Sequence, residues 1–372
     1  MDIPATSTWL EIDLEAIRSN VRELRKISAS NVMAVVKANG YGHGIVEAGQ
    51  SALQGGASWL GVARMEEGLS LRAAGIVSPI LVFGYSAPTR AHEAVANKLT
   101  LAVYDHELAE ALSDQAVKTG TCVQVHAKID SGMGRLGVFP EDGVRFIRHL
   151  RDLGGLALQG MFTHFARSDE SERATTDWQI KRFQALVAEL TQAGLRPPLI
   201  HAANSAAALY FPQARFDLVR CGIAIYGLHP SSETPLPDTF RTALAWKARL
   251  ISVKLLPAGH GIGYGHRYTT HGQERIGVVS VGYADGLRRR LGNFALVGGK
   301  RVKVTGGVCM DQIMLQLDGV PEARVGDEVV LIGRQGAECI TAEEIGREWG
   351  SVNYDVVCGL QARVPRFYIN QG

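Results

Sequence analysis

The first 240 or so residues alternate short, nearly continuous apolar runs with longer amphipathic stretches. The eight runs are 32–36, 58–63, 79–83, 100–104, 122–129, 156–163, 199–202 and 218–226. Runs with so little polar alternation are typical of strands that are buried on both faces. Between them, stretches such as 179–193 have the apolar spacing of surface helices. The pattern predicts a (β/α)8 TIM-like barrel over residues 1–238, with a doubly wound open sheet as the competing architecture.

The pattern changes at residues 229–238, where HPSSETPLPD reads as a linker. Strand-like runs follow at 247–256, 275–281, 294–297, 301–305, 312–317 and 327–332. Turn residues separate these runs at short intervals, which predicts a mostly β domain over residues 239–372. One helix is expected at 342–349, because Thr341 and Glu344 have the spacing of a capping box.

Composition narrows the function classes. The 372 residues contain 39 Lys and Arg against 37 Asp and Glu, a net charge of +2, so neither a nucleic-acid nor a membrane partner is expected. The five cysteines are scattered without a C-x-x-C pair, so we expect neither disulfides nor a metal site. No signal peptide and no long apolar run are recognisable, and the expected location is therefore the cytoplasm.

In a barrel of this kind, functional side chains stand where the strands end. The first run ends at Lys37, before the glycine-rich segment ANGYGHG. Partial burial would make this amine available as a nucleophile or base, since burial disfavours the charged form. A lysine that simply emerges into solvent is the alternative.

The fifth run ends at Lys128 and Asp130 and leads into SGMGRLG. Its glycines match G-x-G-x-x-G, which would suit a dinucleotide-binding protein. However, no helix starts at the third glycine and no acidic residue ends the next strand, so the match is weak. Arg135 is better interpreted as a clamp for an anion.

Further polar residues stand at the last three strand ends. They are His164, the pair Asn204 and Ser205, and Arg220 with Gly222 and Ile223. The loops after the last two strands of such barrels often bind phosphate. A structural histidine and an ordinary helix cap are the alternatives.

The β region adds tyrosines flanked by glycine or set in turns. These motifs contain Tyr264, Tyr283 with Asp285, Met310 with Asp311, and Tyr354. Turn formation with an incidental aromatic residue is the alternative for each.

Together these motifs resemble the alanine racemase family. The segments are AVVKANGYGHG, KIDSGMGRLG, FTHFA, HAANSAAAL, VRCGIAIYG, GIGYGHRY, VGYADG, CMDQ, SVNYD and ARVPR, and they span nearly the whole chain in the family's order. The resemblance implies a barrel that binds pyridoxal 5′-phosphate (PLP), followed by a β domain. It also implies a homodimer in which the β domain completes the partner's active site.

The resemblance assigns roles to individual residues. Lys37 would bind PLP covalently and act as one base, and Tyr264 of the partner subunit would be the other base. His164 would orient that tyrosine, Arg220 would face the pyridine nitrogen, and Arg135 would contact cofactor and substrate. The phosphate would be held by Tyr41, Ser205, Gly222, Ile223 and Tyr354, with Asn204 nearby. Met310 would contact the substrate, and Asp169, Tyr283 and Asp311 would line the access path.

At one position the resemblance implies a modified side chain, and at two others the chain differs from the family. Some members of the family carry a carbamylated lysine at the position of Lys128, and we predict the same modification here, bonded to Arg135. An ordinary lysine paired with Asp130 is the alternative. The chain departs from the family at Gly307, where arginine is frequent, and at Leu287, where an aromatic residue is common. Both departures concern the access path.

The implied activity is the PLP-dependent interconversion of L- and D-alanine by two bases, which supplies D-alanine for peptidoglycan. Three alternatives remain: a racemase of serine or of a broader amino-acid set, a PLP-dependent decarboxylase, and a non-catalytic PLP-binding protein. The decarboxylase is disfavoured because Arg220 occupies the position of its acidic partner for the pyridine nitrogen.

Overall fold

The computed structural model describes residues 6–290 and 292–371 and divides the chain into two compact units. One unit comprises residues 16–241, and the other comprises the described residues up to Glu15 and from Thr242 onward. The first strand, β1 (Thr8–Asp13), belongs to the second unit because it pairs with β10 (Leu244–Leu256) and β19 (Arg366–Ile369). The domain range expected from the sequence, 1–238, had assigned this segment to the barrel.

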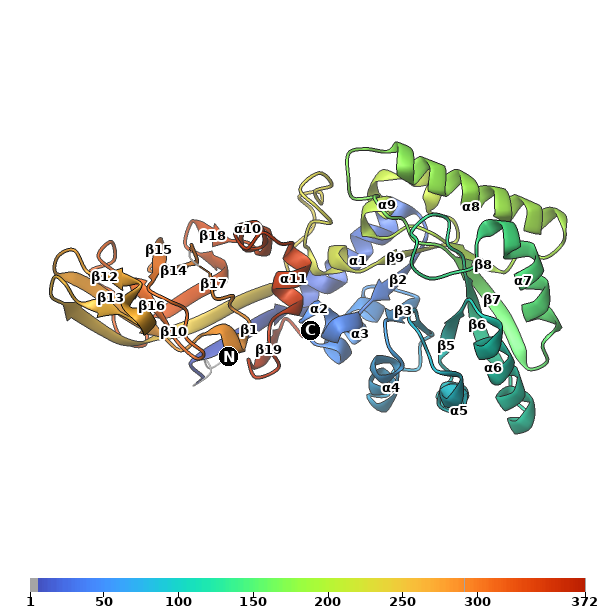
Figure 1. Ribbon diagram of the computed structural model, residues 1–372, viewed down its shortest axis with the longest axis horizontal. Helices are drawn as coiled ribbons and strands as arrows, with labels where there is room; N and C mark the ends of the chain where they lie inside the picture. The colour runs from blue at the N-terminus through green and yellow to red at the C-terminus, as the bar shows by residue number, and fades with distance from the viewer. Residues whose placement is uncertain (1–5, 291, 372) are drawn as a thin grey trace. The chain divides into compact units, whose positions relative to one another are not determined.

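The first unit is the expected barrel of parallel strands (Figure 1). Its strands are β2 (Asn31–Val35), β3 (Trp59–Val62), β4 (Ile80–Val82), β5 (Thr100–Val103), β6 (Val123–Lys128), β7 (Leu156–Phe162), β8 (Leu199–His201) and β9 (Leu218–Cys221). They pair in the order β8-β7-β6-β5-β4-β3-β2-β9. Two backbone hydrogen bonds, from Asp217 to Ile200 and from Arg220 to Ala203, link β9 to the β8 segment and nearly close the barrel.

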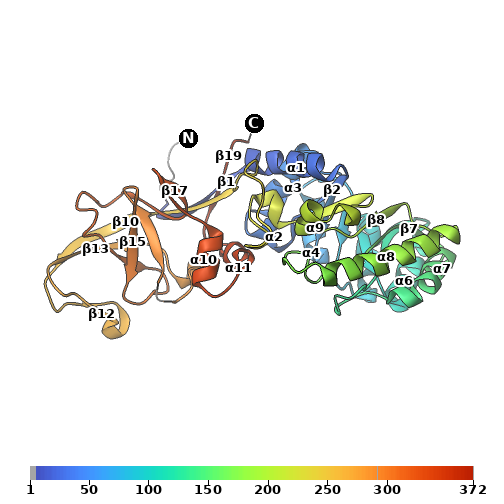
Figure 2. The same ribbon diagram turned by 90° about the horizontal axis from the view of Figure 1, so that it is seen from above.

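Helices connect these strands and cover the outside of the barrel, as Figure 2 shows from above. The α-helices are α1 (Leu14–Ser28), α2 (Lys37–Tyr41), α3 (Ile45–Gln54), α4 (Met65–Ala73), α5 (Ala91–Ala96), α6 (His106–Thr119), α7 (Pro140–Asp152), α8 (Ala174–Gln192) and α9 (Ser205–Tyr210). Three short 3-10 helices are η1 (Pro88–Arg90), η2 (Pro212–Ala214) and η3 (Ile223–Tyr226).

Inward-facing side chains from the strands fill the barrel. Met33, Trp59, Leu81, Ala102, Phe162 and Leu218 form one buried cluster, with Phe83 and Leu199 packed against it. Because each residue comes from a different strand, the cluster holds the strand ends in fixed positions around the barrel. Replacing one of the large side chains by alanine typically costs about 2–5 kcal/mol.

The last apolar run, 218–226, is a strand only at its beginning. The chain leaves β9 at Gly222 and winds into η3, which ends at Gly227 in the left-handed region (φ 71°). Ile223 to Tyr226 are all buried, so their apolar character reflects the core and not a strand. A short buried helical turn and a buried strand cannot be distinguished by apolar periodicity.

The second unit is built on an antiparallel arrangement that closes on itself. It contains β11 (Gly261–Ile262), β12 (Tyr268–Thr269), β13 (Glu274–Val279), β14 (Phe294–Val297), β15 (Lys300–Thr305), β16 (Ile313–Gln316), β17 (Glu328–Gln335) and β18 (Glu338–Ile340) in addition to β1, β10 and β19. The pairing of β17 with β10 joins the ends of the run β17-β14-β15-β16-β13-β10, so these six strands form a ring. The mostly β character expected from the sequence is confirmed.

Short helices complete the second unit: α10 (Ala342–Glu348), α11 (Asn353–Cys358), η4 (Tyr264–His266) and η5 (Tyr283–Asp285). The predicted cap of α10 is present, because the Thr341 hydroxyl accepts a hydrogen bond from the Glu344 backbone at 3.1 Å. Within the described ranges, no helix is long and apolar enough to cross a membrane.

Candidate active site

Lys37 stands at the mouth of the barrel, directly after β2, on an unusual piece of backbone. The next four residues all have positive φ, and Ala38, Asn39 and Tyr41 are not glycine. Such strained conformations cost about 1–3 kcal/mol each and persist only where the surroundings fix them. Here Glu67 accepts a hydrogen bond from the Ala38 backbone at 2.6 Å. The strain concentrated after Lys37 marks this segment as a functional candidate.

Tyr41, Ser205 and Gly222 come from three different segments and form one cradle. A Cβ at Gly222 would lie 2.3 Å from the Tyr41 hydroxyl, so only glycine permits this approach. The Ser205 hydroxyl accepts a hydrogen bond from the Gly222 backbone at 3.1 Å. Asn204 caps the helix that carries Ser205 by accepting from the Ala207 backbone at 3.0 Å. Hydroxyl and backbone N–H groups therefore converge where β9 ends, next to Ile223.

Arg220 is buried at the end of β9 and is held by several partners. Its guanidinium donates to the carbonyls of Thr163 at 2.7 Å and Ala202 at 2.9 Å. It also lies 3.0 Å from His201 Nδ1 and 3.3 Å from His164 Nδ1. Because arginine can only donate, both histidines must accept at Nδ1 and carry their proton on Nε2.

This assignment extends to a further histidine. His201 Nε2 lies 2.8 Å from His126 Nδ1, so His201 donates and His126 accepts. Burial holds the pKa of both histidines below the ordinary value, to about 3 for His126. The result is a chain of neutral imidazoles that fixes the orientation of the Arg220 guanidinium.

The glycine-rich loop after β6 wraps around the carboxylate of Asp130. Its oxygens accept backbone N–H bonds from Gly132, Met133, Gly134 and Arg135, at 2.7–3.1 Å. The loop then returns to β6, and Ile129 pairs with Val138. The G-x-G-x-x-G match thus serves a turn around Asp130, which explains it without a dinucleotide.

Lys128 is buried beside this loop, with its ammonium 4.7 Å from the centre of the Phe162 ring. Burial and the nearby Arg220 and Arg135 hold its pKa well below the ordinary value, and Asp130 opposes this shift. No carboxylate lies within 4.0 Å of Lys128 among the residues that the structure describes. The alternative in which Lys128 pairs directly with Asp130 is therefore not observed.

The charges at the barrel mouth are predominantly positive. Burial lowers the pKa of His164, and the positive charges of Arg220, Lys128, Arg135 and Lys37 lower it further. These groups, which the sequence had placed at separate strand ends, therefore act on one another. The carboxylate of Asp130 is already engaged by four backbone N–H groups, so the cluster is suited to an anionic ligand.

Asp169 also belongs to the first unit. Its backbone carbonyl accepts a hydrogen bond from Ser231, and burial raises the pKa of its carboxyl group.

In the second unit the predicted site residues lie on loops and short helices. Tyr264 is 72% exposed and lies between Gly263 and Gly265, both with positive φ. Its loop packs against Gly307, whose backbone lies within 4 Å of a Cβ built on Gly263. The departure from the family at Gly307 is therefore adjacent to the Tyr264 loop.

A second group in this unit surrounds η5. The Tyr283 and Ala284 backbones donate to the carbonyls of Cys309 and Met310, each at 3.0 Å. Arg363 bridges Asp285 and Asp311 at 3.0 and 2.9 Å. Tyr354 lies on α11, and the segment that follows this helix contacts η5, because the Gln361 backbone donates to the Asp285 carbonyl. Leu287, the second departure from the family, is buried.

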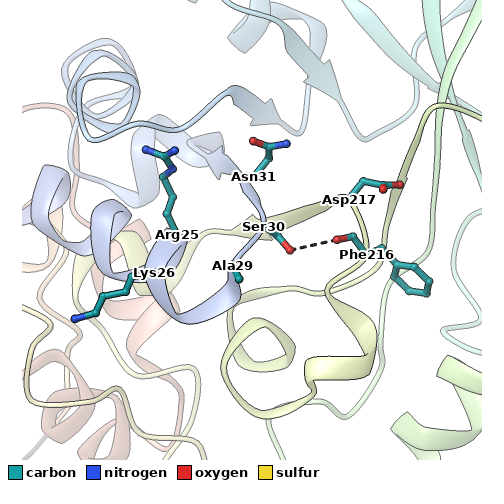
Figure 3. A pocket seen from close by; sticks show the side chains of 7 residues that line it. All are labelled: Arg25, Lys26, Ala29, Ser30, Asn31, Phe216 and Asp217. Atoms are coloured by element: carbon teal, nitrogen blue, oxygen red, sulfur yellow. Dashed lines mark hydrogen bonds between the residues drawn. The ribbon is translucent and has the colours of Figure 1, made fainter.

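A separate pocket opens at the other end of the barrel strands. Figure 3 shows its lining residues, Arg25, Lys26, Ala29, Ser30, Asn31, Phe216 and Asp217. Ser30 and Phe216 in this pocket are joined by a hydrogen bond of 3.2 Å from the serine hydroxyl to the carbonyl. The pocket contains none of the predicted site residues.

Comparison with known proteins decides the family. Residues 12–230 match the family model "Alanine racemase, N-terminal domain", and residues 243–368 match "Alanine racemase, C-terminal domain". An alanine racemase of Symbiobacterium thermophilum is 48% identical, with 97% of each chain aligned.

The chain belongs to the alanine racemase family.

Solved structures agree with this membership. The crystal structure of alanine racemase from D-cycloserine-producing Streptomyces lavendulae superposes with a TM-score of 0.94 at 36% identity, covering 99% of this chain and 98% of the other. A histidine racemase from Leuconostoc mesenteroides also superposes, with a TM-score of 0.90 at 30% identity and 99% coverage of both chains. The fold of the alanine racemase family therefore also occurs in a racemase named for another amino acid.

Two residues that support the candidate site of this alanine racemase family member were missed by the sequence analysis. His126 and His201 link to Arg220, yet neither was singled out. Alternation along β6 places His126 on the same face as Lys128 and Asp130, so extending that argument by two residues would have found it. The partnership of His201 with Arg220 depends on two strands that are adjacent only in the folded barrel.

Proposed function

We propose that this chain interconverts L- and D-alanine with PLP as its cofactor, as a homodimer in which two bases act from opposite sides of the substrate. The observation that supports this best is the position of Lys37. It precedes a strained backbone segment, and its charge acts on His164 together with those of Arg220, Lys128 and Arg135. The chain that carries it belongs to the alanine racemase family.

The residues at the barrel mouth fit PLP. A phosphate carries negative charge and accepts hydrogen bonds, and the cradle of Tyr41, Ser205 and the Gly222 backbone offers donors to it. Ile223 begins η3 beside this cradle and Asn204 supports it, while Tyr354 is the contribution we assign to the β domain. Bound PLP supplies an electron sink that stabilises negative charge at the substrate Cα.

Arg220 would face the pyridine nitrogen of this cofactor. Arginine cannot accept a proton from the ring and can only donate to it. The carbonyls of Thr163 and Ala202 and the Nδ1 atom of His201 hold the guanidinium in place. A donor held at this position would limit how strongly the ring withdraws electrons, which would favour return of the proton over side reactions such as transamination.

Racemisation requires a proton to leave one face of Cα and return to the other. Lys37 would serve one face, and Tyr264 of the partner subunit would serve the other. Tyr264 is exposed on a glycine-flanked loop, as expected of a residue that acts outside its own domain. His164 carries its proton on Nε2, so it can donate to the tyrosine oxygen and stabilise the phenolate.

Substrate recognition would combine charge and size. Arg135 is exposed at the barrel mouth and would bind the substrate carboxylate as well as the cofactor. Met310 would limit the space for the side chain, and Asp169, Tyr283 and Asp311 would line the access path. We assign the reaction to the cytoplasm, where five free cysteines are ordinary, and its product to peptidoglycan synthesis.

A racemase with a broader substrate set is the second candidate. It is favoured by the similarity to the histidine racemase and by the small residue Gly307 beside the Tyr264 loop. Gly307 leaves space where many family members carry arginine, so larger substrates would meet less obstruction.

Chiral analysis of products separates these candidates. The purified, PLP-loaded protein is incubated with L-alanine, L-serine, L-lysine or L-histidine, and the enantiomers are separated. We expect D-alanine to form far faster than any other D-amino acid. Comparable rates for several substrates would establish the broader racemase, and bound PLP without turnover of any of them would establish a non-catalytic protein.

A further inference from the structure

Three side chains on the outside of the barrel converge between α6 and α7. His106 and Glu110 are one turn apart on α6 and therefore share a face, and His149 reaches toward them from α7. One ligand atom from each residue lies within 4.8 Å of the other two. The His106 and His149 rings are 4.4 Å apart and nearly perpendicular.

The most informative atom of this group is His149 Nε2. It is buried and has no hydrogen-bond partner. Its nearest acidic atom, Glu110 Oε1, lies 3.8 Å away, which is too long for a hydrogen bond. A buried polar atom without a partner is destabilising by about 1–3 kcal/mol. The structure thus has a nitrogen lone pair or N–H group directed into a cluster that does not satisfy it.

Two imidazoles and a carboxylate are a recognised ligand set for zinc. Zinc would bring its ligand atoms to about 2.0–2.2 Å from the ion, and hence to roughly 3.3 Å from one another. The observed spacing requires a contraction of up to about 1.5 Å, which rotation of long or exposed side chains can supply. His106 and Glu110 are exposed, whereas the backbone below them is fixed by the Asp105 cap of α6.

We propose that His106, Glu110 and His149 bind one divalent transition-metal ion, with Zn²⁺ as the ion that best suits these ligands. Water would complete the coordination. The site lies in the helical layer and not at the strand ends, so its role is to tie α6 to α7 and stabilise the folded barrel. An ion that binds the folded chain and not the unfolded chain stabilises the folded chain by mass action.

The test measures Zn²⁺ binding to the chelator-treated, PLP-loaded protein by competition with a chromogenic chelator. We expect one ion per chain to be lost, or its affinity to fall at least about tenfold, in both His106→Gln and His149→Gln. Zn²⁺ should also raise the unfolding midpoint of the wild-type protein by a few degrees and leave that of the variants unchanged.

His92→Gln is the matched control. His92 is an exposed histidine on the neighbouring helix α5, and its Nδ1 contacts the Thr89 carbonyl. This variant should bind Zn²⁺ as the wild type does. Circular dichroism and PLP absorbance establish that each variant is folded. If His149→Gln fails to fold, His106→Gln, at an exposed position, tests the proposal alone. Equal Zn²⁺ affinity and an equal midpoint shift in wild type and His106→Gln would overturn the proposal.

Discussion

The two units present their candidate site residues in opposite ways. In the barrel, Arg220 is 5% exposed and its guanidinium is hydrogen-bonded to two carbonyls and two histidines. In the β unit, Tyr264 is 72% exposed on a loop between glycines. A buried, fully bonded group holds a fixed geometry, whereas an exposed loop residue needs a second surface to define its position.

This difference in burial predicts two different effects of substitutions on the reaction. Substitutions in the barrel set should alter how the cofactor is bound and how it reacts, because these side chains form its surroundings. Substitution of Tyr264 in the β unit should leave the cofactor in place and impair proton transfer alone. The variants below test this distinction, from the largest expected effect to the smallest.

Lys37→Ala should have the largest effect. The strand-end amine is the attachment point that we assign to PLP, so the variant should lose covalently bound cofactor and racemisation should fall by more than about 10⁴-fold. Absorbance of the purified protein and chiral product analysis measure the two losses. Lys118→Ala, on the exposed face of α6, is the control and should behave as the wild type. Wild-type absorbance of bound cofactor in Lys37→Ala would contradict the assignment.

Tyr264→Phe should retain the cofactor and lose one base. Removal of a positioned acid–base group typically costs about 10²–10⁴-fold in rate. Abstraction of the proton from L-alanine should suffer most, and primary isotope effects with α-deuterated alanine report this step in each direction. Tyr85→Phe is the control, since Tyr85 is similarly exposed, at 69%, in the barrel. If the isotope effects of Tyr264→Phe equal those of the wild type in both directions, Tyr264 is not the second base.

Arg220→Glu should change the course of the reaction more than it changes binding. A carboxylate beside the pyridine nitrogen would let the ring keep a proton and withdraw electrons more strongly. We expect slower racemisation, a changed visible spectrum with substrate and an increased ratio of transamination to racemisation. Arg220→Lys keeps the positive charge and should not raise that ratio. An unchanged ratio in folded Arg220→Glu would place Arg220 away from the pyridine ring.

Substitution of Lys128 should reduce activity less than the three substitutions above, through loss of one specific modification. We predict that it is carbamylated, which would replace a buried ammonium beside Arg135 by an anion that bonds to it. Lys128→Ala should reduce activity about ten- to a hundredfold, because Arg135 would lose its support. Acetate should restore part of the loss by occupying the same position. A crystal structure with an unmodified lysine at neutral pH, together with no rescue by acetate, would disprove the modification.

The buried histidines predict a pH dependence of stability. Burial lowers the pKa of His126 to about 3, so it stays neutral in the folded chain, while in the unfolded chain it binds a proton below pH 6.5 or so. The unfolded state then holds more protons, and stability falls as the pH decreases from about 6.5 toward 3, by up to about 1.4 kcal/mol per pH unit. Urea unfolding at pH 7 and pH 5 should show a smaller pH effect in His126→Gln than in wild type. The exposed His92→Gln should retain the wild-type slope, and an unchanged slope in His126→Gln would refute the contribution of His126.

The eight apolar runs of the barrel were recognisable because their burial leaves few polar positions. The observed strands begin and end within a few residues of the predicted runs, as at Thr100–Val103 against 100–104. The run 218–226 was predicted as one strand, but η3 occupies its second half, since apolar burial alone does not define backbone conformation. The segment Thr8–Asp13 was not predicted as a strand, because its partners β10 and β19 lie at the far end of the chain.

The candidate site likewise has residues that the sequence identified and contacts that only the structure shows. Lys37 and Lys128 could be identified because each stands at the end of an apolar run, which places it at the barrel mouth in any (β/α)8 fold. Arg220 was recognisable as a charged residue within the apolar run 218–226. The strained backbone after Lys37, by contrast, depends on a hydrogen bond from Ala38 to Glu67 on another helix. Such contacts between distant segments leave no periodic trace in the sequence.

The sequence by itself determined the positions of the eight barrel strands along the chain, the identity of the amine at the first strand end and the motifs that resemble the alanine racemase family. These features are local, because burial, turn formation and chemical type are properties of short segments. Only the tertiary structure decided that His126, His201 and Arg220 form one hydrogen-bonded chain, and that Asp130 is engaged by the loop instead of Lys128. These pairings depend on distances between segments that are far apart in sequence, and packing of the whole barrel sets those distances.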